Sequence, residues 1–185
     1  MFDLTKELKK FVPYNDREKQ DVERTLEFLK GEHCYDRTNT KGHITAGAFV
    51  CSKDGEVLLN HHTASGMWFQ FGGHSDGESD SFNVAKREVF EEAGIEKFEV
   101  LKPGIFDVNV EEIEDRPQKN ESAHIHYDIN FLFCVEDKNF TISEESMDIK
   151  WVSIEQAKTL VNKDDLGMQR MLEKYEKILK DKKSQ

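Results

Sequence analysis

The sequence has few cysteines and no long apolar run, and both absences limit the class of protein to which it can belong. No apolar stretch approaches the roughly 18 residues that a membrane-spanning helix needs, and the N-terminus has no apolar segment of the signal-peptide kind. The three cysteines, Cys34, Cys51 and Cys134, are odd in number and lack the paired spacing of a zinc site. We therefore expect a cytoplasmic protein with reduced thiols, neither secreted nor inserted in a membrane.

An excess of positive charge is also lacking. The formal net charge is −11, with 26 Lys and Arg against 37 Asp and Glu, so we expect no basic patch that binds nucleic acid through its phosphates. An anionic small molecule would need metal ions to bridge it to so acidic a site. At 185 residues the chain is long enough for one well-buried core and short for two, and we expect a single domain over residues 1–185.

The pattern of apolar residues predicts strands interleaved with helices. A helix over about 16–30 begins at Asn15, whose side chain suits the first turn together with Glu18. Strands over His43–Cys51 and Glu56–His62 form a hairpin. The predicted parts are an N-terminal helical extension over 1–32, a core over 42–160 with further strands at 67–71, 98–110 and 151–152 and a helix at 154–161, and a C-terminal helix over 164–181.

A long strand is predicted over 123–133, after a polar loop over 111–123. Alternate side chains of a strand point to opposite faces. One face of this strand is apolar, and the other carries His124, His126, Asp128 and Asn130. Such a polar face indicates either a strand that lines a wet pocket or an edge strand that faces solvent.

The most distinctive stretch is a glycine-rich loop, Gly72–Glu78, that leads into a helix with an acidic cluster. Glycine reaches positive φ without steric cost, so the loop can turn tightly. On the helix, Glu88 lies three residues before Glu91 and four before Glu92, so the three can converge. Gly94 is placed to end the helix. A hard divalent cation such as Mg²⁺ or Mn²⁺ would remove the repulsion between the carboxylates; a solvated acidic face is the alternative.

The order of these residues resembles the Nudix box, G-x5-E-x7-R-E-U-x-E-E-x-G-U, in which U is apolar. The match is complete over Arg87–Ile95. A count from Gly73 puts Ser79 where the family has its first glutamate, and Glu78 fits only when the count begins at Gly72. The resemblance is specific at the box and extends over about residues 42–160.

The register of the loop can be predicted from the arginine of the box. Arginine's planar fork prefers a carboxylate, which serine does not offer. We therefore expect the loop to place Glu78 against Arg87, with Ser79 or Asp80 capping the helix.

The resemblance implies a Nudix-type α/β/α sandwich with a mixed sheet, to which the N-terminal and C-terminal helices are added. It also implies a pyrophosphohydrolase with Mg²⁺ (or Mn²⁺), which uses metal-activated water to cleave a pyrophosphate bond in a nucleoside diphosphate-linked or related small molecule. The residues that it assigns are Glu88, Glu91 and Glu92 as catalytic residues and metal ligands, Gly72 or Gly73 as a carbonyl ligand, and Arg87 with Glu78 as the pair that holds the loop.

Further candidates lie outside the box. We expect Glu145, rather than Glu144, to face the metal as an added acidic ligand, because it precedes Trp151 by six residues. The general base is left open between Glu88 and a carboxylate elsewhere, and the candidates for substrate binding are aromatic. These candidates are Glu111, Glu112 and Glu114 for the base, and His74, His124, His126 and Trp68 for the substrate.

Two other classes of protein stay open. A diphosphate isomerase of the isopentenyl-diphosphate type shares the fold but needs a cysteine and an acid across an apolar pocket, and no motif near Cys51 or Cys134 supports this. A nucleotide-binding regulatory module would not need three convergent carboxylates. We expect no nucleic-acid or membrane partner and leave a homodimer open. The sequence does not select the diphosphate substrate.

Overall fold

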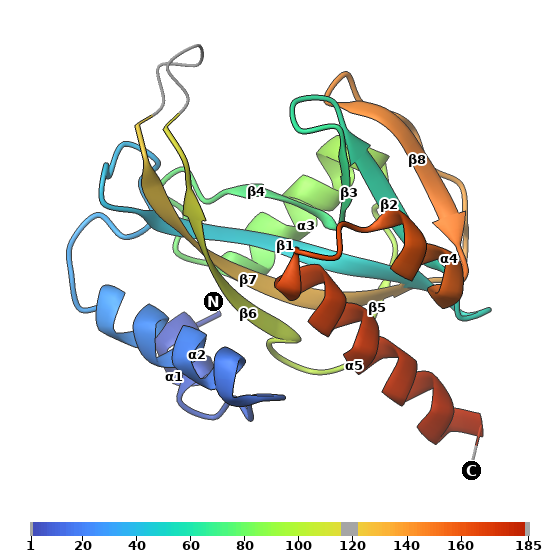
Figure 1. Ribbon diagram of the computed structural model, residues 1–185, viewed down its shortest axis with the longest axis horizontal. Helices are drawn as coiled ribbons and strands as arrows, with labels where there is room; N and C mark the ends of the chain where they lie inside the picture. The colour runs from blue at the N-terminus through green and yellow to red at the C-terminus, as the bar shows by residue number, and fades with distance from the viewer. Residues whose placement is uncertain (1, 116–121, 184–185) are drawn as a thin grey trace.

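The computed structural model describes residues 2–115 and 122–183, and a mixed sheet lies at its centre (Figure 1). Parallel pairing joins β1 and β7, and the remaining pairs are antiparallel. The main path is β3-β2-β1-β7-β5, with β4 paired to β1, β6 to β7 and β8 to β2. The strands are β1 (His43–Ser52), β2 (Val57–His62), β3 (Met67–Phe69), β4 (Phe71–His74), β5 (Glu99–Val100), β6 (Asp107–Ile113), β7 (His124–Val135) and β8 (Ser146–Val152). The helices are α1 (Leu4–Leu8), α2 (Asp16–Phe28), α3 (Ser81–Ala93), α4 (Ile154–Leu160) and α5 (Leu166–Lys183).

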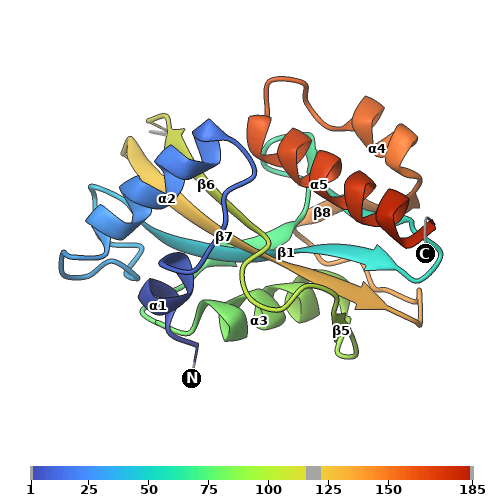
Figure 2. The ribbon, with the colours of Figure 1, turned by 90° about the horizontal axis from the view of Figure 1, so that it is seen from below.

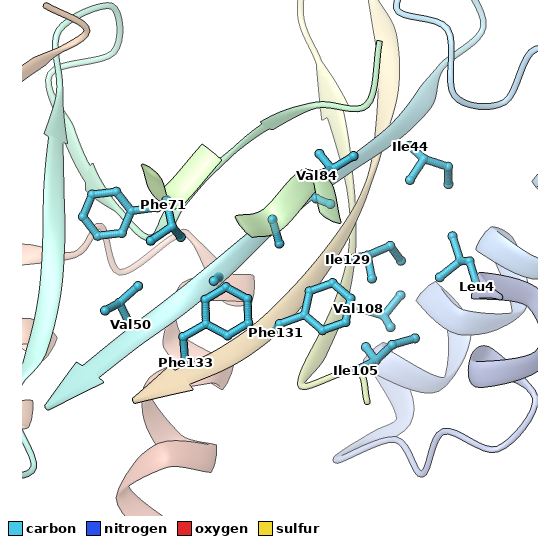
Figure 3. Packing of buried hydrophobic residues seen from close by; sticks show 14 of the residues in the cluster. Leu4, Ile44, Val50, Phe71, Val84, Ile105, Val108, Ile129, Phe131 and Phe133 are labelled. Carbon is cyan, nitrogen blue, oxygen red and sulfur yellow. The ribbon is translucent and has the colours of Figure 1, made fainter. Parts of the chain in front are cut away.

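Helices cover both faces of the sheet, with α3 on one side and α4 and α5 on the other (Figure 2). Because successive side chains of β1 point to opposite faces, Phe49 packs in the core beneath α4 and α5, whereas Ala48 packs in the core against α3. Figure 3 shows the α3 side, where Val84 of α3 and Phe131 and Phe133 of β7 belong to one cluster. The predicted α/β sandwich with a mixed sheet and added terminal helices is confirmed. No described helix is both long and apolar enough to span a bilayer.

The helix ends follow the expected capping chemistry. Asn15 accepts a hydrogen bond from the amide of Glu18 at 2.9 Å and begins α2. Ser153 forms a capping box at α4, and Asp165 accepts from the amide of Met168 at the start of α5. The N-terminal region differs from prediction because it holds two helices, α1 and α2.

Strand boundaries are where the predictions fail most. The strand predicted over 67–71 is two strands, since β3 pairs with β2 and β4 pairs with β1. The polar loop predicted over 111–123 is wrong at its start, because β6 continues through Ile113 in register with β7. Part of that loop, residues 116–121, lies outside the described residues. The strand predicted at 151–152 begins earlier, at Ser146.

A buried cluster of charges joins the two added helices to β6. Arg170 of α5 donates two hydrogen bonds to Asp107 of β6, at 2.8 and 2.7 Å. Lys174 donates to Asp107 at 2.7 Å and also pairs with Glu18 of α2. Glu18 in turn accepts from the amide of Val108 at 3.1 Å. Because β6 pairs with β7, this cluster helps to fix the strand that carries the polar face.

Candidate functional site

A cavity of about 820 Å³ lies where β1, β4, β7 and α3 meet. The four alternating polar residues predicted on β7 all line it; they are His124, His126, Asp128 and Asn130. β7 lies inside the sheet between β1 and β6, so it is not an edge strand. The structure therefore favours the wet-pocket interpretation of this face over the solvent-exposed one.

Glycines let β1 and β4 approach each other closely beside the cavity. A Cβ at Gly72 would lie 2.8 Å from the Cα of Gly47 and 3.0 Å from the carbonyl oxygen of Ala46. A Cβ at Gly73 would instead meet the carboxylate of Glu88, with the carboxyl carbon at 2.7 Å. There is thus no room for a side chain at position 73, because the Glu88 carboxylate packs directly on the backbone of Gly73.

Helix α3 presents the glutamates because its other side is anchored in the core. Val84, Ala85 and Val89 are fully buried, and Asp80 caps the helix through the amide of Asn83 at 3.2 Å. Gly94 ends it in the left-handed conformation, with φ 67°, as predicted. The opposite side of α3 then faces β4 and the cavity.

Glu92 is the most enclosed carboxylate of the box, with 6% of the residue exposed. It accepts hydrogen bonds from Asn60 at 2.8 Å and from the amide of Gly72 at 2.9 Å. Burial raises the pKa of Glu92 to about 8, and the nearby charges of Glu88 and Glu145 add to the effect, while its hydrogen bonds oppose it. Negative charge is therefore costly at this position unless a cation offsets it.

Glu88 shares that environment. Burial raises the pKa of Glu88, whereas Arg87 opposes the rise. Glu88 and Glu92 offer hard oxygen donors, which match the ligand preference of Mg²⁺ or Mn²⁺. Glu145 lines the same cavity, and Glu144 is not among the residues that line it.

Arg87 lies among the acids of the box. Its guanidinium is 3.3 Å from Glu78, 2.8 Å from Glu88 and 3.9 Å from Glu91, and it donates to the carbonyl of His74 at 2.7 Å. The expected contact between Glu78 and Arg87 is thus present, and the helix cap is Asp80 rather than Ser79. These bonds join α3 to the end of β4, which agrees with a positioning role.

The three glutamates lie less close together than their spacing on the helix suggested. Among the described residues, no three carboxylates bring their oxygens within 4.8 Å of one another. The Glu91 side chain is 57% exposed and lies 3.9 Å from the Arg87 guanidinium, whereas Glu88 lies 2.8 Å from it. The one described group of three that meets this distance is formed by His43, His74 and His126.

Histidines gather at one end of the cavity. The ring of His43 lies 4.9 Å from that of His74, 4.8 Å from that of His124 and 4.9 Å from that of His126, measured between centroids. The pKa of His43 is lowered to about 4, chiefly by burial and also by the neighbouring His74 and His124, while a contact with the backbone of Asn39 opposes the change. His43 was missed by sequence reasoning, because only the parallel pairing of β1 with β7 places it opposite His126.

Several predicted site residues lie elsewhere. Trp68 is not among the residues that line the cavity: its ring stacks on His61 with centroids 4.6 Å apart, and the Lys150 ammonium lies 5.2 Å from its centroid. Glu111 and Glu112 line a second, smaller cavity of about 330 Å³. Trp68, Glu111 and Glu112 are therefore not among the residues that line the cavity beside the α3 glutamates.

Sequence reasoning also missed polar residues that the fold brings to the cavity. Arg37 and Gln70 line it, and no local motif marks either one. Asp128, which was noted only as part of a polar face, has an enclosed carboxyl although the residue as a whole is half-buried. Burial raises the pKa of Asp128 to about 7, partly opposed by a hydrogen bond from Thr45.

Comparison with known proteins identifies the class. Residues 41–175 match the family model described as the NUDIX domain, so the chain belongs to the Nudix family of pyrophosphohydrolases. No curated protein matches the chain.

Solved structures share the fold. A C. elegans Ap4A hydrolase in a binary complex has a TM-score of 0.55 and 23% identity, covering 75% of this chain and 98% of that one. An E. coli dihydroneopterin triphosphate pyrophosphohydrolase has a TM-score of 0.54 and 15% identity, with 69% and 91% covered. A MutT protein from Methanosarcina mazei Go1 has a TM-score of 0.54 and 20% identity, with 77% and 98% covered.

Proposed function

We propose that this protein is a metal-dependent hydrolase that cleaves the pyrophosphate bond of a nucleoside diphosphate-linked or related small molecule. The observation that carries the proposal is the placement of Glu88 and Glu92 on the Gly72–Gly73 backbone, with Glu88 lining a polar cavity. Glu92 is buried, Glu88 is half-buried and pairs with Arg87, and the cavity is large enough to hold a nucleotide-sized ligand.

The chain offers oxygen donors for Mg²⁺ or Mn²⁺ at this place. The residues that would hold the ion are Glu88 and Glu92, with Glu91, Glu145 and a carbonyl of Gly72 or Gly73 as further ligands. When bound, the ion would supply charge to neutralise the diphosphate and to activate a water. Asn60 and the amide of Gly72 hold the Glu92 carboxylate in one orientation.

The remaining residues have positioning and binding roles in this proposal. Arg87 fixes Glu88 and, through the carbonyl of His74, the end of β4. His74, His124 and His126 line the cavity in which the substrate would lie. Glu88 is a candidate for the general base.

The site does not suit the isomerase alternative. That reaction needs a cysteine facing the substrate, and none of the three cysteines, all of them described, lines the larger cavity. Cys51 and Cys134 are buried beneath α5, and burial raises the pKa of the Cys51 thiol to about 12. A thiol in that environment is a poor nucleophile or acid-base group at neutral pH.

The test is release of phosphate or nucleotide from a panel of diphosphate-linked compounds with and without Mg²⁺. We expect hydrolysis only with the metal, and a loss of at least about 100-fold in turnover for Glu92→Gln, which keeps shape but removes charge. Glu96→Gln is the matched control, since Glu96 is an exposed glutamate just past α3. Full activity of Glu92→Gln at limiting Mg²⁺ would contradict the proposal, as would activity that survives chelation.

A further inference from the structure

The histidine cluster of the cavity has a donor set different from that of the α3 carboxylates, with which it shares the cavity. One ring nitrogen from each of His43, His74 and His126 lies within 4.8 Å of the others. All three residues line the cavity, and they come from three different strands, β1, β4 and β7. Strands held in one sheet make a rigid frame for such a site.

His43 gives a second, independent indication. Only 2% of the residue is exposed, yet neither ring nitrogen has a hydrogen bond of standard geometry within the described part of the chain. Buried polar atoms are nearly always satisfied by protein, water or an ion. A bound ligand would therefore supply a partner for the ring nitrogens of His43.

A relay of hydrogen bonds sets the protonation of His126. Nδ1 of His124 lies 2.7 Å from the carbonyl of Ser122, which can only accept, so this nitrogen carries the proton. When His124 is uncharged, its Nε2 can accept a hydrogen bond from Nε2 of His126, which lies 2.9 Å away. In that tautomer the lone pair of His126 is on Nδ1. Metal-binding histidines commonly donate their other N–H to such an outer partner, which fixes the ring and raises its basicity.

We propose that His43, His74 and His126 form a binding site for a divalent transition metal ion of the zinc class, with His124 as its outer partner. Neutral imidazole suits zinc, iron, cobalt and nickel, whereas Mg²⁺ takes oxygen ligands, so this site and the α3 carboxylates would select different ions. Three protein ligands leave a tetrahedral ion one open position. Because the three histidines line the cavity, a water or an anionic oxygen of a substrate would be able to reach that position.

Binding would draw the three rings together. Zinc–nitrogen bonds of about 2.0–2.1 Å in a tetrahedral site place ligand nitrogens about 3.4 Å apart. From a separation of up to 4.8 Å, this requires small side-chain rotations. His74 and His126 are partly exposed and can make such rotations more easily than buried His43.

In the experiment, the full-length protein is first stripped of bound metal and then placed in saturating Mg²⁺. It is then titrated calorimetrically with Zn²⁺. We expect one Zn²⁺ per chain. His74→Gln and His126→Gln should weaken binding by at least about 100-fold, and His124→Gln by about 10–100-fold, as is usual for outer partners. His61→Gln is the matched control, because His61 stacks on Trp68 outside the cavity. Glu92→Gln separates this site from the proposed hydrolytic one, and it should keep Zn²⁺ affinity within about twofold.

The site would be overturned by no stoichiometric Zn²⁺ uptake by the wild-type chain, or by equal affinity in the histidine variants and the wild type. A dependence of Zn²⁺ binding on Glu92 would place the ion at the carboxylates and also overturn it. X-ray absorption of the Zn²⁺-loaded wild-type protein needs no variant. It should show about three imidazole ligands, and a shell of oxygen alone would contradict the proposal even if a variant failed to fold.

Discussion

Replacing Gly73 by alanine should disturb the geometry of the site while leaving the stability of the fold nearly unchanged. The added Cβ would lie 2.7 Å from the Glu88 carboxyl carbon and 3.0 Å from its Oε1. Ordinary contact for such a carbon begins at 3.4 Å. The backbone of Gly73 is not in the positive-φ region, so alanine fits the strand, and the carboxylate of Glu88 is the group that must move.

The magnitude of the effect follows from that displacement. The carboxylate must withdraw by about 1 Å, and a misplacement of this size in a catalytic group can cost about 100-fold in rate, or about 2.7 kcal/mol of transition-state stabilisation. Stability should change little, because the group that moves is the end of a side chain. The weakened contact with Arg87, whose side chain is 33% exposed, is worth at most about 1 kcal/mol.

The assay combines turnover with metal binding. Gly73→Ala should lower kcat on any compound that the wild type hydrolyses and weaken Mn²⁺ binding measured by electron paramagnetic resonance, while the thermal midpoint stays close to wild type. Gly31→Ala is the control: its Cβ would lie 3.3 Å from the carbonyl oxygen of Phe28, at the end of α2 and away from the cavity. Unchanged kcat and unchanged Mn²⁺ affinity in folded Gly73→Ala would refute the role given to the Glu88 carboxylate.

Two further substitutions test the frame around the site. Gly72→Ala places a Cβ against the backbone of β1, which cannot move aside as a side chain can. We therefore expect urea unfolding to show a destabilisation of about 1–3 kcal/mol. Wild-type stability in this variant would show that β1 and β4 are less tightly packed. Asp107→Asn removes the negative charge that faces Arg170 and Lys174 in the buried charge cluster, and should lower the free energy of unfolding by about 3–5 kcal/mol. Its control, Glu7→Gln in the exposed pair with Lys10, should lower it by less than about 1 kcal/mol. Equal effects of these two would contradict the structural role of the cluster.

Local spacing was enough to predict that Arg87, Glu88 and Glu92 share one helix, but not how far their carboxylates converge. The preference of arginine for a carboxylate likewise predicted Glu78 as its partner, which is 3.3 Å away. The alternation of polar residues on β7 predicted a polar face but left open whether it lined a pocket or faced solvent.

Long-range pairing was the information that the sequence lacked. Nothing in the chain marks β1 as the parallel neighbour of β7, and this pairing is what brings His43 to His126. Trp68 was misjudged for a related reason, since β3 pairs with β2 and stacks the ring on His61. The expectation of one domain over residues 1–185 stays a prediction.

The charges of α5 show the same limit. The apolar pattern predicted this helix over 164–181, and Met168, Met171 and Leu172 are buried. Arg170 and Lys174 are buried as well, although charged residues of a terminal helix normally face solvent. Their partners lie on β6 and α2, and only the assembled fold brings those carboxylates within reach.

Hydrolysis in ¹⁸O-labelled water tests the central claim most directly. A compound turned over from the diphosphate panel is incubated with the protein and Mg²⁺, and the products are examined by mass spectrometry. Attack by water on the pyrophosphate predicts one ¹⁸O atom in a phosphate-containing product, formed by the wild type and lost in Glu92→Gln. Conversion of a substrate without incorporation of the label, or binding of diphosphates across the panel with no turnover at all, would contradict the assignment of this site to pyrophosphate hydrolysis.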